Sequence, residues 1–266
     1  MSRRNIIYRA LAAAVIILAA ACSKTGEPGV SRVSFTASIG DYTFTRALAD
    51  GSGVNHVWCG AYLNGTLITQ AEAPVSGGSA ILVLDLANNR EYDIVMWACN
   101  STKALWNFNP ATAQVTATYA NETSSSADND AFWYKGTLVP QGARSIGVEL
   151  SRAVAQIHIG TTASFSTVSD VEVSVSNVPS TWNLLTGVMG GQADVDFSLG
   201  AAPAEDFTIG ATNYHFLAAV SVLAPAEKTT TNISFSLDMD GNAVSKSIDN
   251  TSICRNWCTR IAGVIQ

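Results

Sequence analysis

The chain has 266 residues, of which only 14% are charged, and its formal net charge is -6. Binding to nucleic-acid phosphates requires clustered Lys and Arg, which this chain lacks outside its first few residues, so the composition argues against a nucleic-acid partner. The length suits two domains of roughly 100 to 200 residues each, or one large β sandwich. The many Ser, Thr, Ala, Val and Gly residues, with frequent turn signals, favour strands over helices.

The chain begins with a pattern typical of an exported protein. Three arginines precede an apolar run, residues 10–21, which is too short to cross a bilayer and predicts a signal peptide over residues 1–21. The run ends at Cys22, and Leu18 to Cys22 resembles a bacterial lipobox, so Cys22 is the expected lipidation site. Residues 22–30 would form a polar tether. An ordinary signal peptide with a chance cysteine is the alternative.

A first block of strands is expected over residues 31–145. It opens with a strand that is apolar on one face only, because Val33, Phe35, Ala37 and Ile39 alternate with polar residues. Further on, Asn64-Gly65 predicts a two-residue hairpin turn.

The rest of this block reads as strands separated by loops. Residues 80–86 are apolar on both faces, which predicts a central strand buried on both sides. Residues 106–110 are expected to form an irregular connection, and the polar, aperiodic residues 121–130 an exposed loop. About seven strands result, at the spacing of a β sandwich.

The boundary between the two blocks is placed by a change of phase. Val148 and Leu150 share one face of an extended chain, but beyond Arg152 the apolar positions shift by one residue. Such a slip predicts a bulge, or a strand that passes from one sheet to another. A second β-sandwich domain is therefore expected over residues 146–266, with a hairpin turn at Asp240-Gly241.

Catalytic and metal sites are not predicted. Asp238 and Asp240 lack the glutamate that would complete a calcium loop, and the adjacent Glu205 and Asp206 are better explained as a solvated acid pair. His158 is explained as an exposed or hydrogen-bonded histidine. We therefore expect no enzyme activity, no metal and no cofactor.

Four cysteines remain besides Cys22. Cys254 and Cys258, if they share a strand, lie roughly 13 Å apart at about 3.3 Å per residue, too far for a disulfide. Cys59 and Cys99 could form a bridge only from neighbouring strands in register. The alternative is that these cysteines are small buried apolar residues.

Several motifs, in this order and spacing, carry a family resemblance. They are Thr45-Arg46-Ala47, residues 54–57, the Tyr92 to Ala98 strand with Trp97, residues 150–157, and the tail Arg255 to Gly263. Together they resemble the fimbrillin-like lipoproteins of the Bacteroidales, which are subunits and accessory or anchor proteins of type V pili. The tail departs from the family pattern at Trp257-Cys258 and Arg260.

The resemblance implies two tandem transthyretin-like β sandwiches on a lipid-anchored protein of the outer membrane and cell surface. In pilins of this family, an arginine-specific protease removes the N-terminal strand, and a strand of the next subunit fills the groove. The resemblance makes the Arg46-Ala47 bond the candidate maturation site, and Val33, Phe35, Ala37 and Ile39 the candidate detachable strand. The expected partners are other pilus subunits, the outer membrane and a host or glycan ligand.

Three other functions remain open from the sequence. The protein could be an uncleaved pilus anchor. It could also be a surface lipoprotein that binds glycans or a host protein through Trp106, Phe108 and Trp133, although aromatics in β sandwiches more often belong to the core. A hydrolase is the third alternative, but no acid/base pair can be named for it.

Overall fold

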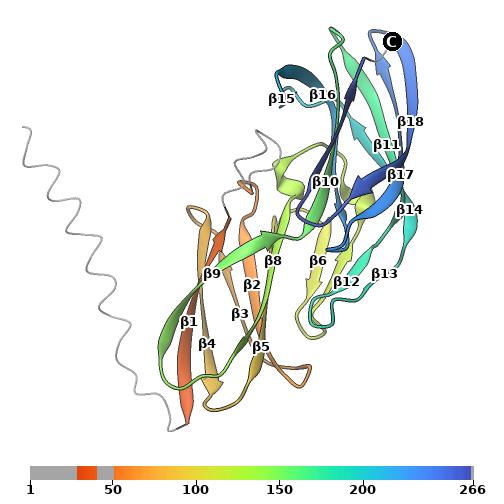
Figure 1. Ribbon diagram of the computed structural model, residues 1–266. Helices are drawn as coiled ribbons and strands as arrows, with labels where there is room; N and C mark the ends of the chain where they lie inside the picture. The colour runs from red at the N-terminus through yellow and green to blue at the C-terminus, as the bar shows by residue number, and fades with distance from the viewer. Residues whose placement is uncertain (1–28, 41–50, 265–266) are drawn as a thin grey trace, which may run out of the picture.

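The computed structural model describes residues 29–40 and 51–264 of the chain, and it is all-β. Figure 1 shows two elongated lobes that strand β9 (Arg144–Arg152) and strand β10 (Val154–Thr161) connect. Among the described residues, no helix has the length and apolar character needed to span a membrane.

The first lobe is a seven-stranded sheet folded into two layers. One layer has the order β9, β1 (Val30–Ile39) and β4 (Ser79–Ala87). The other has the order β3 (Thr66–Pro74), β2 (His56–Leu63), β5 (Tyr92–Cys99) and β8 (Ala131–Leu138). Strand β9 joins the layers, because its end pairs with β8 through Phe132 and Arg152.

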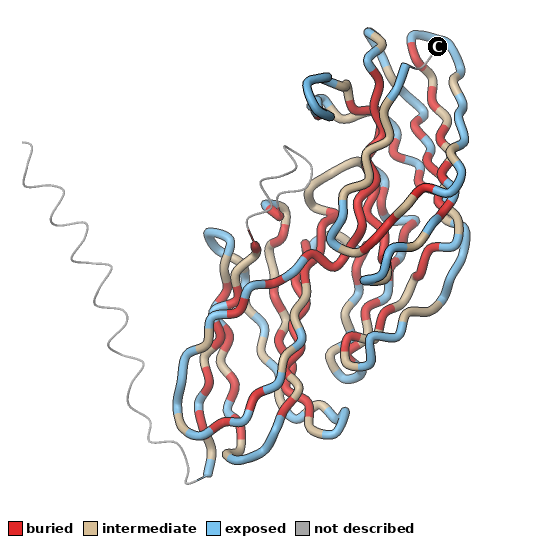
Figure 2. Tube along the Cα trace, viewed as in Figure 1, coloured by how far each residue is buried: buried red, intermediate tan, exposed pale blue. Residues whose placement is uncertain are grey.

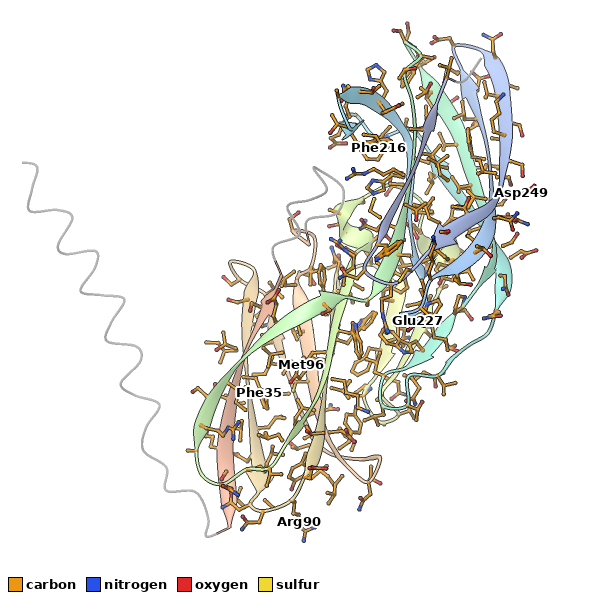
Figure 3. All side chains as sticks on the ribbon, viewed as in Figure 1. Phe35, Arg90, Met96, Phe216, Glu227 and Asp249 are labelled. Carbon is orange, nitrogen blue, oxygen red and sulfur yellow. The ribbon has the colours of Figure 1, made fainter. Side chains whose placement is uncertain are left out.

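The core of this lobe lies between the two layers. Alternate residues of β1 and β4 point inward, and they meet the inward residues of β2 and β5 in one apolar cluster. Phe35 on β1 and Met96 on β5 both lie in this interior (Figure 3). Figure 2 shows the resulting pattern, in which buried and exposed positions alternate along the strands.

The second lobe has two four-stranded sheets. The first has the order β15 (Asp206–Ile209), β16 (Thr212–Leu223), β10 and β19 (Cys258–Gly263). The second has the order β14 (Ala193–Gly200), β11 (Val168–Val178), β17 (Thr229–Met239) and β18 (Asn242–Ile253). Apolar residues of both sheets, such as Ile157 and Phe235, belong to one core cluster.

A small third sheet combines segments of both sequence blocks. Its order is β13 (Met189–Gly190), β12 (Thr181–Asn183), β7 (Gln114–Ala117) and β6 (Trp106–Asn109). Two short 3₁₀ helices follow β7, η3 (Tyr119–Asn121) and η4 (Ala127–Asn129). Because β7 precedes residue 146 yet pairs with β12, the packing crosses the boundary expected from sequence. That boundary stays a prediction.

The shift of the apolar positions beyond Arg152 is confirmed as a change of sheet. Strand β9 belongs to the seven-stranded sheet and β10 to a four-stranded sheet, with only Ala153 between them. All residues of β10 are buried, so neither face of this strand is exposed to solvent. Its polar residues must therefore find partners inside the protein.

Both predicted hairpin turns are confirmed. Asn64 and Gly65 connect β2 to β3 with φ values of 52° and 79°, and Asp240 and Gly241 connect β17 to β18 with 52° and 80°. Positive φ at both central residues is the geometry that Asn-Gly and Asp-Gly favour.

Three local expectations are wrong. Strand β4 is not a central strand buried on both faces: it ends its sheet and leaves Ile81 67% exposed. Residues 106–109 are a strand rather than an irregular connection. The polar residues 121–130 are not an exposed loop, because Glu122, Asn129 and Asp130 are buried.

Candidate functional site

The candidate site is strand β1 and the two strands that flank it. β1 pairs antiparallel with β4, where Phe35 lies opposite Leu82, and parallel with β9, where Phe35 lies opposite Ile146. β1 is therefore an inner strand of its layer. If it were removed, β4 and β9 would each present a row of unpaired backbone groups along a gap, which we call the β1 slot.

The inward face of β1 fills the slot with apolar side chains. Val33, Phe35 and Ala37 are at most 2% exposed, whereas Arg32 and Thr36, on the opposite face, are exposed. Full burial of a Val or Phe side chain stabilises a fold by about 1.5–3 kcal/mol. Ile39 packs more loosely at the edge of the same cluster.

Hydrogen bonds hold both ends of β1. At its start, the Ser31 hydroxyl donates to Asn88 Oδ1 and accepts from the Gly142 N–H at 2.7 Å, and the Asn88 N–H donates to the Gly29 carbonyl at 2.7 Å. At its end, the Ile39 N–H donates to the Gly78 carbonyl at 2.9 Å. The contacts fix the register of β1 without a covalent link.

The chain is described again from Gly51, beside the end of β1. A Cβ atom on Gly51 would lie 2.7 Å from Ile39 Cγ2 and 3.0 Å from Phe132 Cζ, and the φ of 75° also favours glycine. Three predicted site residues, Cys22, Arg46 and Ala47, lie outside the described residues. Their roles stay predictions.

His158 and Cys258 lie together inside the second lobe, although sequence reasoning treated them separately. His158 Nδ1 is 3.3 Å from Cys258 Sγ. Burial, with the charges of Arg260 and Arg152, lowers the pKa of His158 to about 3, and burial raises the pKa of the Cys258 thiol. Both groups are therefore neutral at pH 7, which is unlike the thiolate of a catalytic cysteine.

Cys59, Cys99 and Cys254 are free and buried. Cys59 and Cys99 are on neighbouring strands, but Cys59 lies opposite Met96 and Cys99 opposite His56, so the two thiols are out of register. Burial raises the pKa of both to about 12. Within residues 29–40 and 51–264, no three His, Cys, Asp or Glu side chains are grouped so that they could hold a metal ion.

The expected aromatic platform does not form. Trp106 is 5% exposed, and its Nε1–H donates to the Asn129 carbonyl at 2.9 Å. Trp133 packs on Trp182 with ring centroids 4.6 Å apart, under the guanidinium of Arg255. Trp106 thus belongs to the core cluster, and Trp133 packs against it. The half-buried Phe108 is the third ring.

Sequence reasoning missed a buried ion pair at the end of β9. Arg152 Nε lies 3.0 Å from both carboxylate oxygens of Asp130, and the two side chains are 4% and 0% exposed. The pair fixes the residues before β8 to the end of β9. Arg152, at the point where the apolar alternation shifts, was the available signal in the sequence. Its partner Asp130 lies in the polar residues 121–130, which the sequence pattern predicts to be exposed to solvent.

The architecture defines an all-β protein of packed sandwiches in which an N-terminal strand completes the first layer. Over residues 29–265 the chain matches the family described as "Family of unknown function (DUF6562)". The chain belongs to this family. No curated protein matches it.

Solved structures share the fold at low sequence identity. A candidate cell adhesion protein from Bacteroides ovatus is 11% identical, with a TM-score of 0.55 over 89% of this chain and 94% of its own. A candidate adhesin from Bacteroides thetaiotaomicron is 14% identical, with a TM-score of 0.55 over 83% and 80% of the two chains. A fimbrial assembly protein from Parabacteroides distasonis is 13% identical, with a TM-score of 0.50 over 88% and 91%.

Proposed function

We propose that this protein is a lipid-anchored cell-surface precursor of a pilus subunit or pilus-associated adhesin, and that it assembles by strand exchange after its N-terminal strand is removed. The observation that carries the proposal is the position of β1, an inner strand near the N-terminus that noncovalent contacts hold between β4 and β9. Removal of β1 would expose the edges of β4 and β9 and the apolar side chains on which β1 packs.

The physics of strand addition supports this function. Unpaired backbone groups give a slot affinity for any extended segment, and apolar pockets at alternate positions select its sequence. In the β1 slot those pockets are the ones that Val33, Phe35 and Ala37 now fill. A strand from another subunit with the same alternation would restore both ladders and the core.

Two further observations favour a pilus over other surface functions. The motifs from Thr45 to Gly263 resemble fimbrillin-like lipoproteins in order and spacing, and one protein of the same fold is described as a fimbrial assembly protein. In this proposal Cys22 carries the lipid that holds the precursor at the outer membrane, and the two lobes are transthyretin-like. Cleavage after Arg46, before Ala47, separates β1 from the rest of the chain.

Incubation of the purified precursor with an arginine-specific protease tests the proposal. We expect one main cut after Arg46, located by mass spectrometry, followed by a ladder of polymers on non-denaturing gels. Arg46→Ala should abolish the cut and the ladder, whereas Arg90→Ala, at an exposed position before β5, should change neither. A precursor that resists cleavage at Arg46 would refute the subunit role and favour an uncleaved anchor.

A further inference from the structure

We propose that the outer face of strand β2 carries a binding site for a neutral oligosaccharide, centred on Trp58. Trp58 packs against the core cluster that includes Trp97 and Trp106, not against the interior of the first lobe, and it lines two hollows, one of about 250 Å³ and one of about 390 Å³. The larger hollow falls within the usual range for small-ligand sites, about 300–1,000 Å³. This site goes beyond the proposed assembly function and does not require strand exchange.

The ring at the centre of this groove is held in place. On β2, Trp58 lies opposite Glu72 of β3 and Trp97 of β5, so paired strands flank its backbone on both sides. Its indole is half-buried and packs against the His56 ring, with centroids 4.3 Å apart. A ring that is fixed before binding loses little conformational freedom when a ligand stacks on it.

Polar side chains surround the aromatic floor on both sides. Gln70 and Glu72 line the smaller hollow, and Lys103, Asn107 and the half-buried Phe108 line the larger one. Gln70 and Asn107 are exposed, and neither side-chain amide makes a hydrogen bond within the part of the chain that the structure describes. Each amide offers two N–H donors and a carbonyl acceptor to a ligand.

This combination matches the chemistry of a pyranose ring. A sugar presents a face of C–H groups that packs on an aromatic ring, and hydroxyl groups around its edge that both donate and accept hydrogen bonds. Trp58 and Phe108 would take the C–H faces, and Gln70 and Asn107 the hydroxyls. Because hollows flank Trp58 on both sides, the site would bind more than one sugar unit.

Other ligand classes fit the groove less well. A polyanion is disfavoured, since the net charge is -6 and Lys103 already forms an ion pair with Asp128 at 3.7 Å. An extended peptide would need apolar pockets at alternating positions, but exposed polar residues such as Ser101 and Thr118 line much of the larger hollow. A neutral sugar uses the amides, the hydroxyls and the rings together.

The proposal is tested by titrating the uncleaved precursor with four sugars and following binding by calorimetry and tryptophan fluorescence. The sugars are maltohexaose, cellohexaose, chitohexaose and mannohexaose. At least one should bind saturably. Trp58→Ala should weaken that binding by about tenfold or more, and Trp58→Phe should restore part of it. Trp257→Ala, which removes a 52% exposed tryptophan elsewhere, should leave affinity unchanged.

Three results would overturn the proposal. The first is the absence of saturable binding to all four sugars. The second is sugar binding that survives Trp58→Ala in a variant with unchanged thermal unfolding. The third is saturable binding to an extended peptide library but not to the sugars. Asn107→Ala supplies a second variant on the exposed surface, where the fold is not at risk. It should weaken binding by about threefold, the loss of one modest hydrogen bond.

Discussion

Glu122 Oε1 accepts a hydrogen bond, 2.9 Å long, from the backbone N–H of Ser221 on β16. Two neighbouring side chains act in the same way: Ser125 Oγ accepts from the Ala219 N–H at 2.8 Å, and the Tyr119 hydroxyl accepts from the Leu223 N–H at 3.0 Å. β15 pairs with β16 only through residues 212–215. Three side chains thus replace a strand along the remaining edge, which protects it from pairing with other chains.

The buried Glu122 predicts a specific dependence of stability on pH. Burial raises the pKa of its carboxyl well above the ordinary value. The folded protein therefore keeps a proton that the unfolded chain releases, and stability falls as pH rises from the ordinary carboxyl range through the folded pKa, with a slope of about 1.4 kcal/mol per pH unit for one proton. Glu122→Gln should remove this slope and raise stability at pH 8.

Urea unfolding between pH 4 and pH 9 measures this effect. Glu172→Gln, which changes an exposed glutamate on β11, serves as the matched control and should follow the wild type. If Glu122→Gln and the wild type lost stability in parallel as pH rose, the carboxyl would be ionised in the folded protein and this account of its burial would be wrong.

The ion pair between Asp130 and Arg152 should be costly to break. Asp130→Asn removes the buried carboxylate that Arg152 contacts, and removal of one partner of a buried ion pair typically costs about 3–5 kcal/mol. Asp93→Asn removes the partly exposed pair with Lys135, in which Nζ and Oδ1 are 3.7 Å apart, and should cost about 0–1 kcal/mol. Equal losses for the two variants in urea unfolding would show that Arg152 does not depend on Asp130.

Arg255 should contribute to the contact between the lobes. Its Cζ atom lies 4.7 Å from the ring centroid of Trp133 and 4.4 Å from that of Trp182, and these rings come from β8 and β12. Arg255→Ala should reduce the free energy of unfolding by about 1–2 kcal/mol and shift tryptophan emission to longer wavelength. Lys246→Ala, at an exposed site on β18, should do neither. An unchanged emission spectrum would refute the stacking.

Phe35 is predicted to hold β1 in place. Phe35→Ala opens a cavity between the layers and should destabilise the first lobe by about 3–5 kcal/mol, whereas Thr36→Ala, on the exposed face of the same strand, should change stability by less than about 0.5 kcal/mol. Thermal unfolding measures both. Similar stabilities for the two variants would show that the inward face of β1 does not anchor it.

Local patterns were enough to predict the features that depend on neighbouring residues. The alternation from Val33 to Ile39 predicted the one-sided strand, and Asn64-Gly65 predicted its hairpin. The slip after Arg152 predicted the change of sheet. Each of these signals records the period of a strand or the φ values of a turn, which are properties of a few consecutive residues.

Features that depend on distant partners could not be predicted. The polar residues 121–130 look like a solvated loop because their hydrogen bonds are made to β16, about a hundred residues later in the chain. Ile81 and its neighbours read as a doubly buried strand, since nothing local shows that β4 lies at the end of a sheet. The sequence pattern did not single out Trp58 as a binding residue, because its proposed contact with a sugar depends on the fold placing Phe108 in the same hollow.

Binding of a labelled peptide with the sequence of β1, residues 30–39, tests whether the gap between β4 and β9 accepts a strand from outside the chain. After cleavage and removal of the N-terminal fragment, the remaining protein should stay folded by circular dichroism and bind one peptide per molecule in fluorescence anisotropy. The uncleaved precursor, and a peptide carrying Phe35→Asp, should show no binding. A cleaved protein that remains folded but does not bind the peptide, or that unfolds once the fragment leaves, would contradict the claim that β1 occupies a slot built for exchange.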